Sequence, residues 1–72
     1  MSRIFGMCYE VADDGTEHSI ERIGSDSAEE VGEWIDRVML EHDRKRLHMV
    51  IKDFHGDVIA DVTRDPRPLG KN

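Results

Sequence analysis

The strongest constraint on the fold is the alternation of apolar and polar residues on both sides of His55-Gly56. Residues 47–54 and 57–63 each alternate with a period of two, which is typical of a strand with one buried face. A two-residue turn at His55-Gly56 predicts three pairs: Met49–Val62, Ile51–Ala60 and Asp53–Val58. The mostly apolar face of both strands then consists of Leu47, Met49, Ile51, Val58, Ala60 and Val62. This agreement predicts an antiparallel hairpin with a defined register.

The N-terminal part of the chain predicts another hairpin. Four residues at alternate positions are expected on the buried face of its first strand: Phe5, Met7, Tyr9 and Val11. Asp14-Gly15 is typical of a two-residue turn, which would place Ile20 on the same face but would also bring Arg22 there. A bulge or a three-residue loop over Asp13-Asp14-Gly15 would instead turn Ile23 inward. The hairpin is therefore predicted, and its register stays open between these alternatives.

The segment between the hairpins predicts one helix. Ser27-Ala28-Glu29-Glu30 fits a capping box, in which the serine oxygen accepts a hydrogen bond from the backbone N–H three residues on. An apolar stripe follows at the spacing of one helix face: Val31, Ile35 and Val38, with Trp34 at its margin in the core. Gly32 either lets a strand approach closely or is a tolerated imperfection. The basic run 44–46 suits the negative end of the helix dipole.

The order of these elements is β-β-α-β-β, so we predict the α+β class. Two hairpins of this length are not stable alone, which favours one four-stranded antiparallel sheet with the helix packed on one face. The pattern does not fix the strand order. We expect a single domain over residues 1–63. Residues 64–72 contain two prolines and a glycine, and we expect an extended or disordered tail that is dispensable for folding.

Composition narrows the class of protein. The chain has 72 residues and a net charge of −6, which makes it a poor direct binder of nucleic acid or anionic lipid. Charged residues make up 36% of the chain, and no segment is apolar enough for a membrane span. The first ten residues lack the features of a secretory signal, and Cys8 is the single cysteine. A cytoplasmic location is therefore expected.

Residues that could carry chemistry are few. His42 and His48 could be neighbours across the helix end, but the spacing of the four histidines is not that of a helical zinc site. Cys8 lies within a strand, without a helix N-terminus to activate it, and a packed inert thiol is expected. We predict no catalytic residue, no cofactor and no metal. A ligand site at a dimer interface would have only His48, Asp53 or Asp61 as nearby polar candidates.

Two surfaces remain as candidates for interaction. The open face, which is the side of the sheet opposite the helix, is expected to expose four candidate interface residues: Val50, Lys52, Phe54 and Ile59. The outer side of the helix is expected to expose an acidic ridge of Glu29, Glu33 and Asp36 together with Leu40. The favoured function is a small non-enzymatic protein-interaction module that forms a homodimer through the open face. The alternative is an acidic regulator or inhibitor whose helix docks on a basic or nucleic-acid-binding protein, with no direct contact to nucleic acid or membrane.

Overall fold

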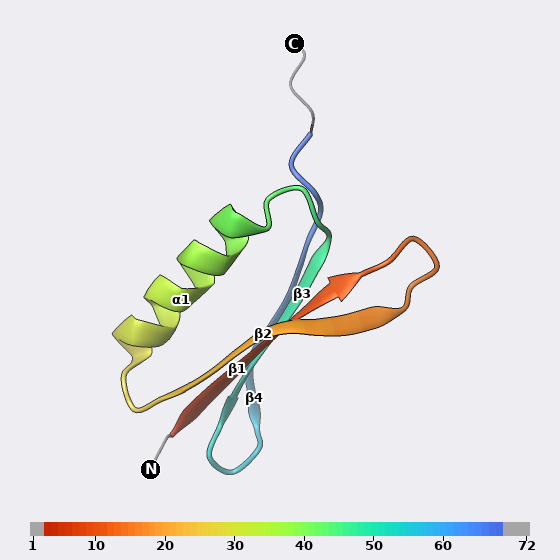
Figure 1. The fold of residues 1–72 in the computed structure, drawn as a ribbon. Helices are drawn as coiled ribbons and strands as arrows, with labels where there is room; N and C mark the ends of the chain where they lie inside the picture. Colours follow the sequence, from red (N-terminus) through yellow and green to blue (C-terminus); the bar gives the residue numbers. More distant parts are fainter. Residues whose placement is uncertain (1–2, 69–72) are drawn as a thin grey trace.

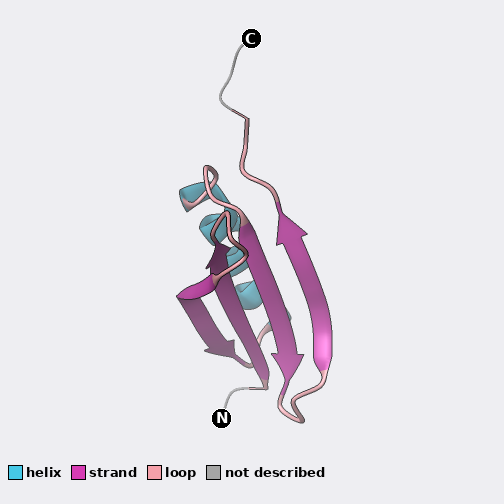
Figure 2. Ribbon diagram, turned by 90° about the vertical axis from the view of Figure 1, so that its right-hand side faces the viewer, coloured by secondary structure: helices cyan, strands magenta, loops and turns pink. Residues whose placement is uncertain are grey.

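The computed structural model describes residues 3–68. Its elements follow the predicted order: β1 (Ile4–Val11), β2 (Glu17–Ser25), α1 (Ala28–Glu41), β3 (Leu47–Asp53) and β4 (Val58–Arg64). The four strands form one antiparallel sheet in the order β2-β1-β3-β4, and α1 lies against one side of it (Figures 1 and 2). The predicted α+β class and β-β-α-β-β layout are confirmed. The strand order places the two hairpins side by side, with β1 and β3 in the centre and β2 and β4 at the edges.

Both hairpins close with a three-residue loop that ends in glycine. In the first, the Ala12 N–H donates to Thr16 O at 2.8 Å, and Gly15 has a φ of +89°. In the second, the Asp53 N–H donates to Asp57 O at 3.0 Å, and Gly56 has a φ of +87°. The three-residue alternative is thus confirmed for the first hairpin, and the two-residue turn predicted for the second is wrong. Both two-residue and three-residue hairpin loops have a position with positive φ that favours glycine. The presence of glycine alone therefore does not distinguish the two loop lengths.

Each hairpin also contains a β-bulge on its second strand. The pairing of β1 with β2 shifts between Cys8 and Tyr9 and leaves Ile20 as the extra residue. The pairing of β3 with β4 shifts between Ile51 and Lys52 and leaves Ile59 as the extra residue. A bulge bends and twists its strand. Figure 1 shows the end of the β1–β2 hairpin curving away from α1.

The face of β1 that packs under the helix differs from the prediction. Gly6 and Cys8 are buried there, whereas Phe5 is exposed on the opposite side and Met7 shares that side. The predicted inward set of Phe5, Met7, Tyr9, Val11 and Ile20 is therefore wrong for its β1 members, although Ile20 does pack against the core. The physical reason is Trp34, whose ring leaves room only for a glycine beneath it.

The β3–β4 register agrees with the prediction over its central pairs. Met49 pairs with Val62 and Ile51 with Ala60. The predicted pairing of Asp53 with Val58 is wrong, because the bulge brings Val58 opposite Lys52. Val58 consequently lies on the open face, while Ile59 turns to the side of the helix, where it lines the same groove as Val31 and Ile35.

The helix is capped at both ends by residues of the sheet and its connections. Ser27 accepts from the Glu30 N–H at 3.2 Å, as the capping box predicts, and the Glu30 carboxylate accepts from the buried Ser25 hydroxyl instead of reaching back to the backbone. At the other end, Arg64 donates to the backbone oxygens of Met39, His42 and Lys45 at 2.7 to 2.8 Å. The predicted cap from residues 44–46 is thus replaced by a side chain of β4.

The core lies between α1 and the sheet. Its buried members are Cys8, Val31, Trp34, Val38, Leu47, Met49 and Ile51. Trp34 is only 5% exposed, which confirms its predicted place in the core. Among the described residues, no strand atom lies within 4 Å of the position that a Cβ atom on Gly32 would take, so the close approach considered for Gly32 belongs to Gly6 instead.

The boundary of the predicted tail needs one correction. Arg64 belongs to β4 and is a structural residue, because its guanidinium binds the end of the helix. Beyond it, Arg67 donates its backbone N–H to Asp43 O at 2.7 Å and pairs with the Asp43 carboxylate at 3.2 Å. Residues 69–72 of the predicted tail lie outside the described part of the chain.

Candidate functional site

The open face carries a different set of apolar side chains from the one that the sequence pattern predicted. The pairing of β1 with β3 places Phe5 beside Lys52, Met7 beside Val50 and Tyr9 beside His48. Val58 lies next to Lys52 on β4. The apolar residues of this face are therefore Phe5, Met7, Tyr9, Val11, Val50 and Val58. They run along β1 and across β3 to the β4 edge, without any helix above them (Figure 1).

His48 forms the polar centre of this face. Its Nδ1 lies 3.1 Å from Oε1 of Glu17, and its Nε2 lies 2.7 Å from Oδ1 of Asp61. The hydrogen bond to Glu17, followed by the one to Asp61, raises the pKa of His48 above its usual value. Each ring nitrogen faces a carboxylate oxygen, an arrangement that the protonated imidazole satisfies in full because it has two N–H donors. The ring also lies 5.9 Å from that of Tyr9.

The charges of the molecule are divided between its two sides. On the open face, the acidic Glu17 and Asp61 are matched in number by Arg22 and Lys52, and His48 adds a further positive charge when it is protonated. The helix α1, in contrast, carries five acidic residues and one basic residue, which gives −5 + 1 = −4. Most of the net charge of −6 therefore lies on the helix and not on the open face.

The four predicted interface residues divide between three places. Val50 and Lys52 lie on the open face as expected. Phe54 is the first residue of the loop, where its ring lies 4.0 Å from that of His55. Ile59 lies on the opposite side of the sheet because of the bulge, which corrects its assignment. Sequence reasoning missed the contribution of β1, because the packing of Trp34 on Gly6 decides which face of that strand turns outward. It missed Val58 because the bulge at Ile59 leaves no clear mark in the alternation.

The polar candidates for a ligand site are also separated. His48 and Asp61 do meet, joined by Glu17, which the sequence did not single out. Asp53 instead accepts the backbone N–H groups of His55 and Asp57 and so serves the loop. His42 lies on the helix side of the sheet, so it is not the neighbour of His48 that the sequence allowed.

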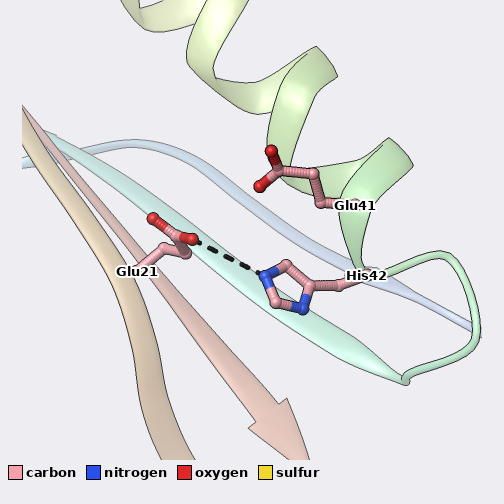
Figure 3. Close-up of side chains that lie close together, drawn as sticks. All are labelled: Glu21, Glu41 and His42. Atoms are coloured by element: carbon pink, nitrogen blue, oxygen red, sulfur yellow. Dashed lines mark ion pairs between the residues drawn. The ribbon is translucent and has the colours of Figure 1, made fainter.

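On the helix side, the structure brings together three groups that could hold a metal ion. Oxygen and nitrogen atoms of Glu21, Glu41 and His42 lie within 4.8 Å of one another, and the pair of Glu21 and His42 is 3.6 Å apart (Figure 3). The cation Arg37 contacts both carboxylates, at 3.8 Å from Glu21 and 2.8 Å from Glu41. Since the guanidinium already compensates half of their charge and His42 also contacts Glu21, the group is explained as an ion-pair cluster that ties the helix end to β2.

Two further candidates keep structural roles. Burial, and secondarily the Glu21 carboxylate, raises the pKa of the Cys8 thiol, which keeps it protonated and unreactive. The basic run after the helix is largely paired: Lys45 lies 3.6 Å from Glu10, and Arg46 lies 3.1 Å from Asp65. Neither group therefore presents a free nucleophile or a free cluster of cations.

The acidic ridge is exposed as predicted. Glu29, Glu33 and Asp36 all lie on the solvent side of α1, and Leu40 next to them is 73% exposed. An apolar side chain of this size among carboxylates is available for contact with another molecule.

Comparisons with protein-family models, curated proteins and solved structures find no match to this chain. Within residues 3–68, no helix has the length and apolar character needed to cross a membrane. A functional assignment therefore depends on the geometry and charge of the two surfaces.

Proposed function

We propose that this protein is a small interaction module without catalytic activity, which forms a homodimer through the open face. The observation that carries the proposal is the apolar strip of Phe5, Met7, Tyr9, Val11, Val50 and Val58 on a sheet surface that the single helix does not cover. A solvated sheet face is normally polar. Contact between two copies around a two-fold axis would remove this strip from water.

The distribution of charge supports this surface over the others. Two copies of net charge −6 repel each other, and the repulsion is weakest where the opposing faces are themselves neutral. The open face comes nearer to this condition than the helix does, because Glu17 and Asp61 are offset by Arg22, by Lys52 and, when it is protonated, by His48. The engagement of both nitrogens of His48 further favours a binding role over acid–base chemistry at this face.

Sedimentation velocity at tens of micromolar tests the proposal. The wild type should sediment as a dimer, and added salt should strengthen the association because it screens the net repulsion while leaving apolar contact intact. The double substitution Phe5→Gln with Val58→Gln should yield a folded monomer. Ile59→Gln is the matched control, because Ile59 is as exposed as Val58 but lies on the other side of the sheet.

A wild type that stays monomeric at these concentrations contradicts the homodimer. A dimer that survives the double substitution but not Ile59→Gln contradicts the choice of face. Circular dichroism spectra of all variants establish that loss of association is not loss of folding.

A further inference from the structure

The helix leaves part of its own side of the sheet uncovered. A helix about 10 Å across covers about two strands that are spaced about 4.8 Å apart. α1 packs mainly on β2 and β1, and Figure 2 shows β4 standing clear of it. Between α1 and β4 lies a groove of about 300 Å³. Its lining is entirely apolar or glycine: Ile4, Ala28, Val31, Gly32, Ile35, Ile51, Ile59 and Ala60.

Several features make this groove open to a partner. Ile59 is 58% exposed, since the bulge turns it into the groove at the sheet edge. Val62 follows on the same side of β4 and is also exposed. Gly32 forms part of the helix wall without a side chain, which leaves space directly above the sheet. The groove is therefore apolar at its floor and accessible from the β4 edge.

The rim on the helix side is acidic. Residues three and four apart are neighbours on a helix surface, so Glu29 and Asp36 flank Gly32 on the side away from the core. Both are exposed, and they belong to the acidic ridge of a helix whose net charge is −4. Leu40 continues this rim with its exposed side chain.

We propose that this groove binds an amphipathic basic α-helix of another protein. Apolar residues on one face of the partner helix would fill the groove, and lysine or arginine side chains beside them would meet Glu29 and Asp36. A helix of about 14 residues is about 21 Å long, which matches both α1 and the seven residues of β4. The partner helix would lie beside α1 at the usual interaxial distance of about 8–10 Å.

The charge pattern selects this occupant over two others. The helix of a second copy would bring its own acidic residues against the acidic ridge, which is repulsive. An extended peptide needs unpaired backbone N–H and C=O groups to bind as an added strand, and the groove is lined by side chains. Such a peptide would therefore bind at the edge of β4 and not in the groove. The groove is on the opposite side of the sheet from the open face, so this inference goes beyond the proposed function and can fail independently of it.

A synthetic peptide of about 14 residues provides the probe. Leucines at helical spacing form its apolar stripe, and lysines flank them; a second peptide carries glutamate in place of every lysine. Fluorescence anisotropy of the labelled peptides measures binding to the full chain, and amide chemical shifts locate it. The lysine peptide should bind saturably at the groove, and the glutamate peptide should bind at least about tenfold more weakly.

Adjacent residues of β4 supply a matched pair of variants. Ile59→Asn should weaken binding of the lysine peptide at least about tenfold, whereas Val58→Asn should change it less than about twofold. Both side chains are more than half exposed, at 58% and 54%, so neither variant should unfold the protein. Glu29→Gln combined with Asp36→Asn should weaken binding severalfold and reduce its salt dependence.

Three results would overturn the inference. The first is the absence of saturable binding, and the second is equal weakening by Ile59→Asn and Val58→Asn. The third is a wild-type dimer that Ile59→Asn dissociates, because the groove would then belong to a second copy. A monomeric wild type that still binds the lysine peptide through Ile59 would support the groove while contradicting the homodimer.

Discussion

The ring of Trp34 lies directly on the backbone of Gly6. A side-chain carbon at residue 6 would lie 2.8 Å from Cζ3 of Trp34, and 3.0 and 3.1 Å from methyl carbons of Ile23 and Ile51. This contact joins the centre of α1 to the centre of β1. It determines which face of β1 turns inward, because only the face that carries Gly6 can accommodate the indole.

Gly6→Ala should therefore destabilise the protein. Trp34 is only 5% exposed and is packed in the core, so the added methyl group is expected to cost roughly 1–3 kcal/mol in the free energy of unfolding. Urea denaturation, followed by tryptophan fluorescence, measures this loss. A variant as stable as the wild type would show that the sheet adjusts freely beneath the indole.

Gly32→Ala, at the glycine within the helix, should have the opposite effect and stabilise the protein. Among the described residues, no atom of the sheet lies within 4 Å of the added carbon, and the position is in the interior of α1. Alanine should raise the free energy of unfolding by about 0.5–1 kcal/mol, because it restricts the unfolded chain and favours the helix. The same urea titration serves as the measurement. A destabilised variant would mean that the helix packs more closely on the sheet at Gly32 than the structure indicates.

The contrast between these glycines explains how far the sequence could predict the fold. Local signals were sufficient for the element order, for the N-cap at Ser27 and for the central pairs of the second hairpin, where both strands carry apolar residues in phase. They were misleading for β1. By hydrophobicity, Phe5 and Met7 suit a core better than Gly6 does, and only a contact with a residue 28 positions away reverses this.

The candidate surfaces were predictable to a smaller extent. The acidic ridge follows from helical periodicity alone, and the structure exposes it. The open face depends on the contact of Trp34 with Gly6, which leaves Phe5 and Met7 on the outer side of β1. It also depends on the bulge at Ile59, which brings Val58 to that side. The meeting of Glu17 with His48 requires β1 to lie next to β3, and the strand order is a property of the tertiary fold that no local pattern encodes.

Arg64→Met should destabilise the end of the helix. The guanidinium binds three backbone oxygens that have no other side-chain donor among residues 3–68, and methionine keeps the apolar stem without the charge. The expected loss is roughly 2–3 kcal/mol in the free energy of unfolding. Hydrogen exchange should also become faster for the amides of the last turn of α1.

Arg67→Met is the control for this position. Arg67 makes an exposed ion pair with Asp43, so its loss should cost less than about 1 kcal/mol. Equal effects of the two substitutions would contradict the assignment of Arg64 as the helix cap. Equal effects would also support the domain boundary at residue 63 that the sequence predicts.

The ion-pair geometry of His48 predicts a dependence of stability on pH. Glu17 and Asp61 raise the pKa of His48 in the folded state above its ordinary value of 6.5, so the folded protein binds the proton more tightly than the unfolded chain does. The resulting stabilisation is fully present below pH 6.5 and is lost as the pH rises through the folded pKa. Because the carboxylates are largely exposed, its size should stay below about 1 kcal/mol.

Urea denaturation of the wild type and His48→Gln should therefore show a stability difference at about pH 6 that shrinks by about pH 8. His18→Gln, an exposed histidine of β2, controls for the general effect of removing an imidazole. A difference between wild type and His48→Gln that is constant across this range, or that grows as the pH rises, would mean that the two carboxylates do not hold the histidine as a cation.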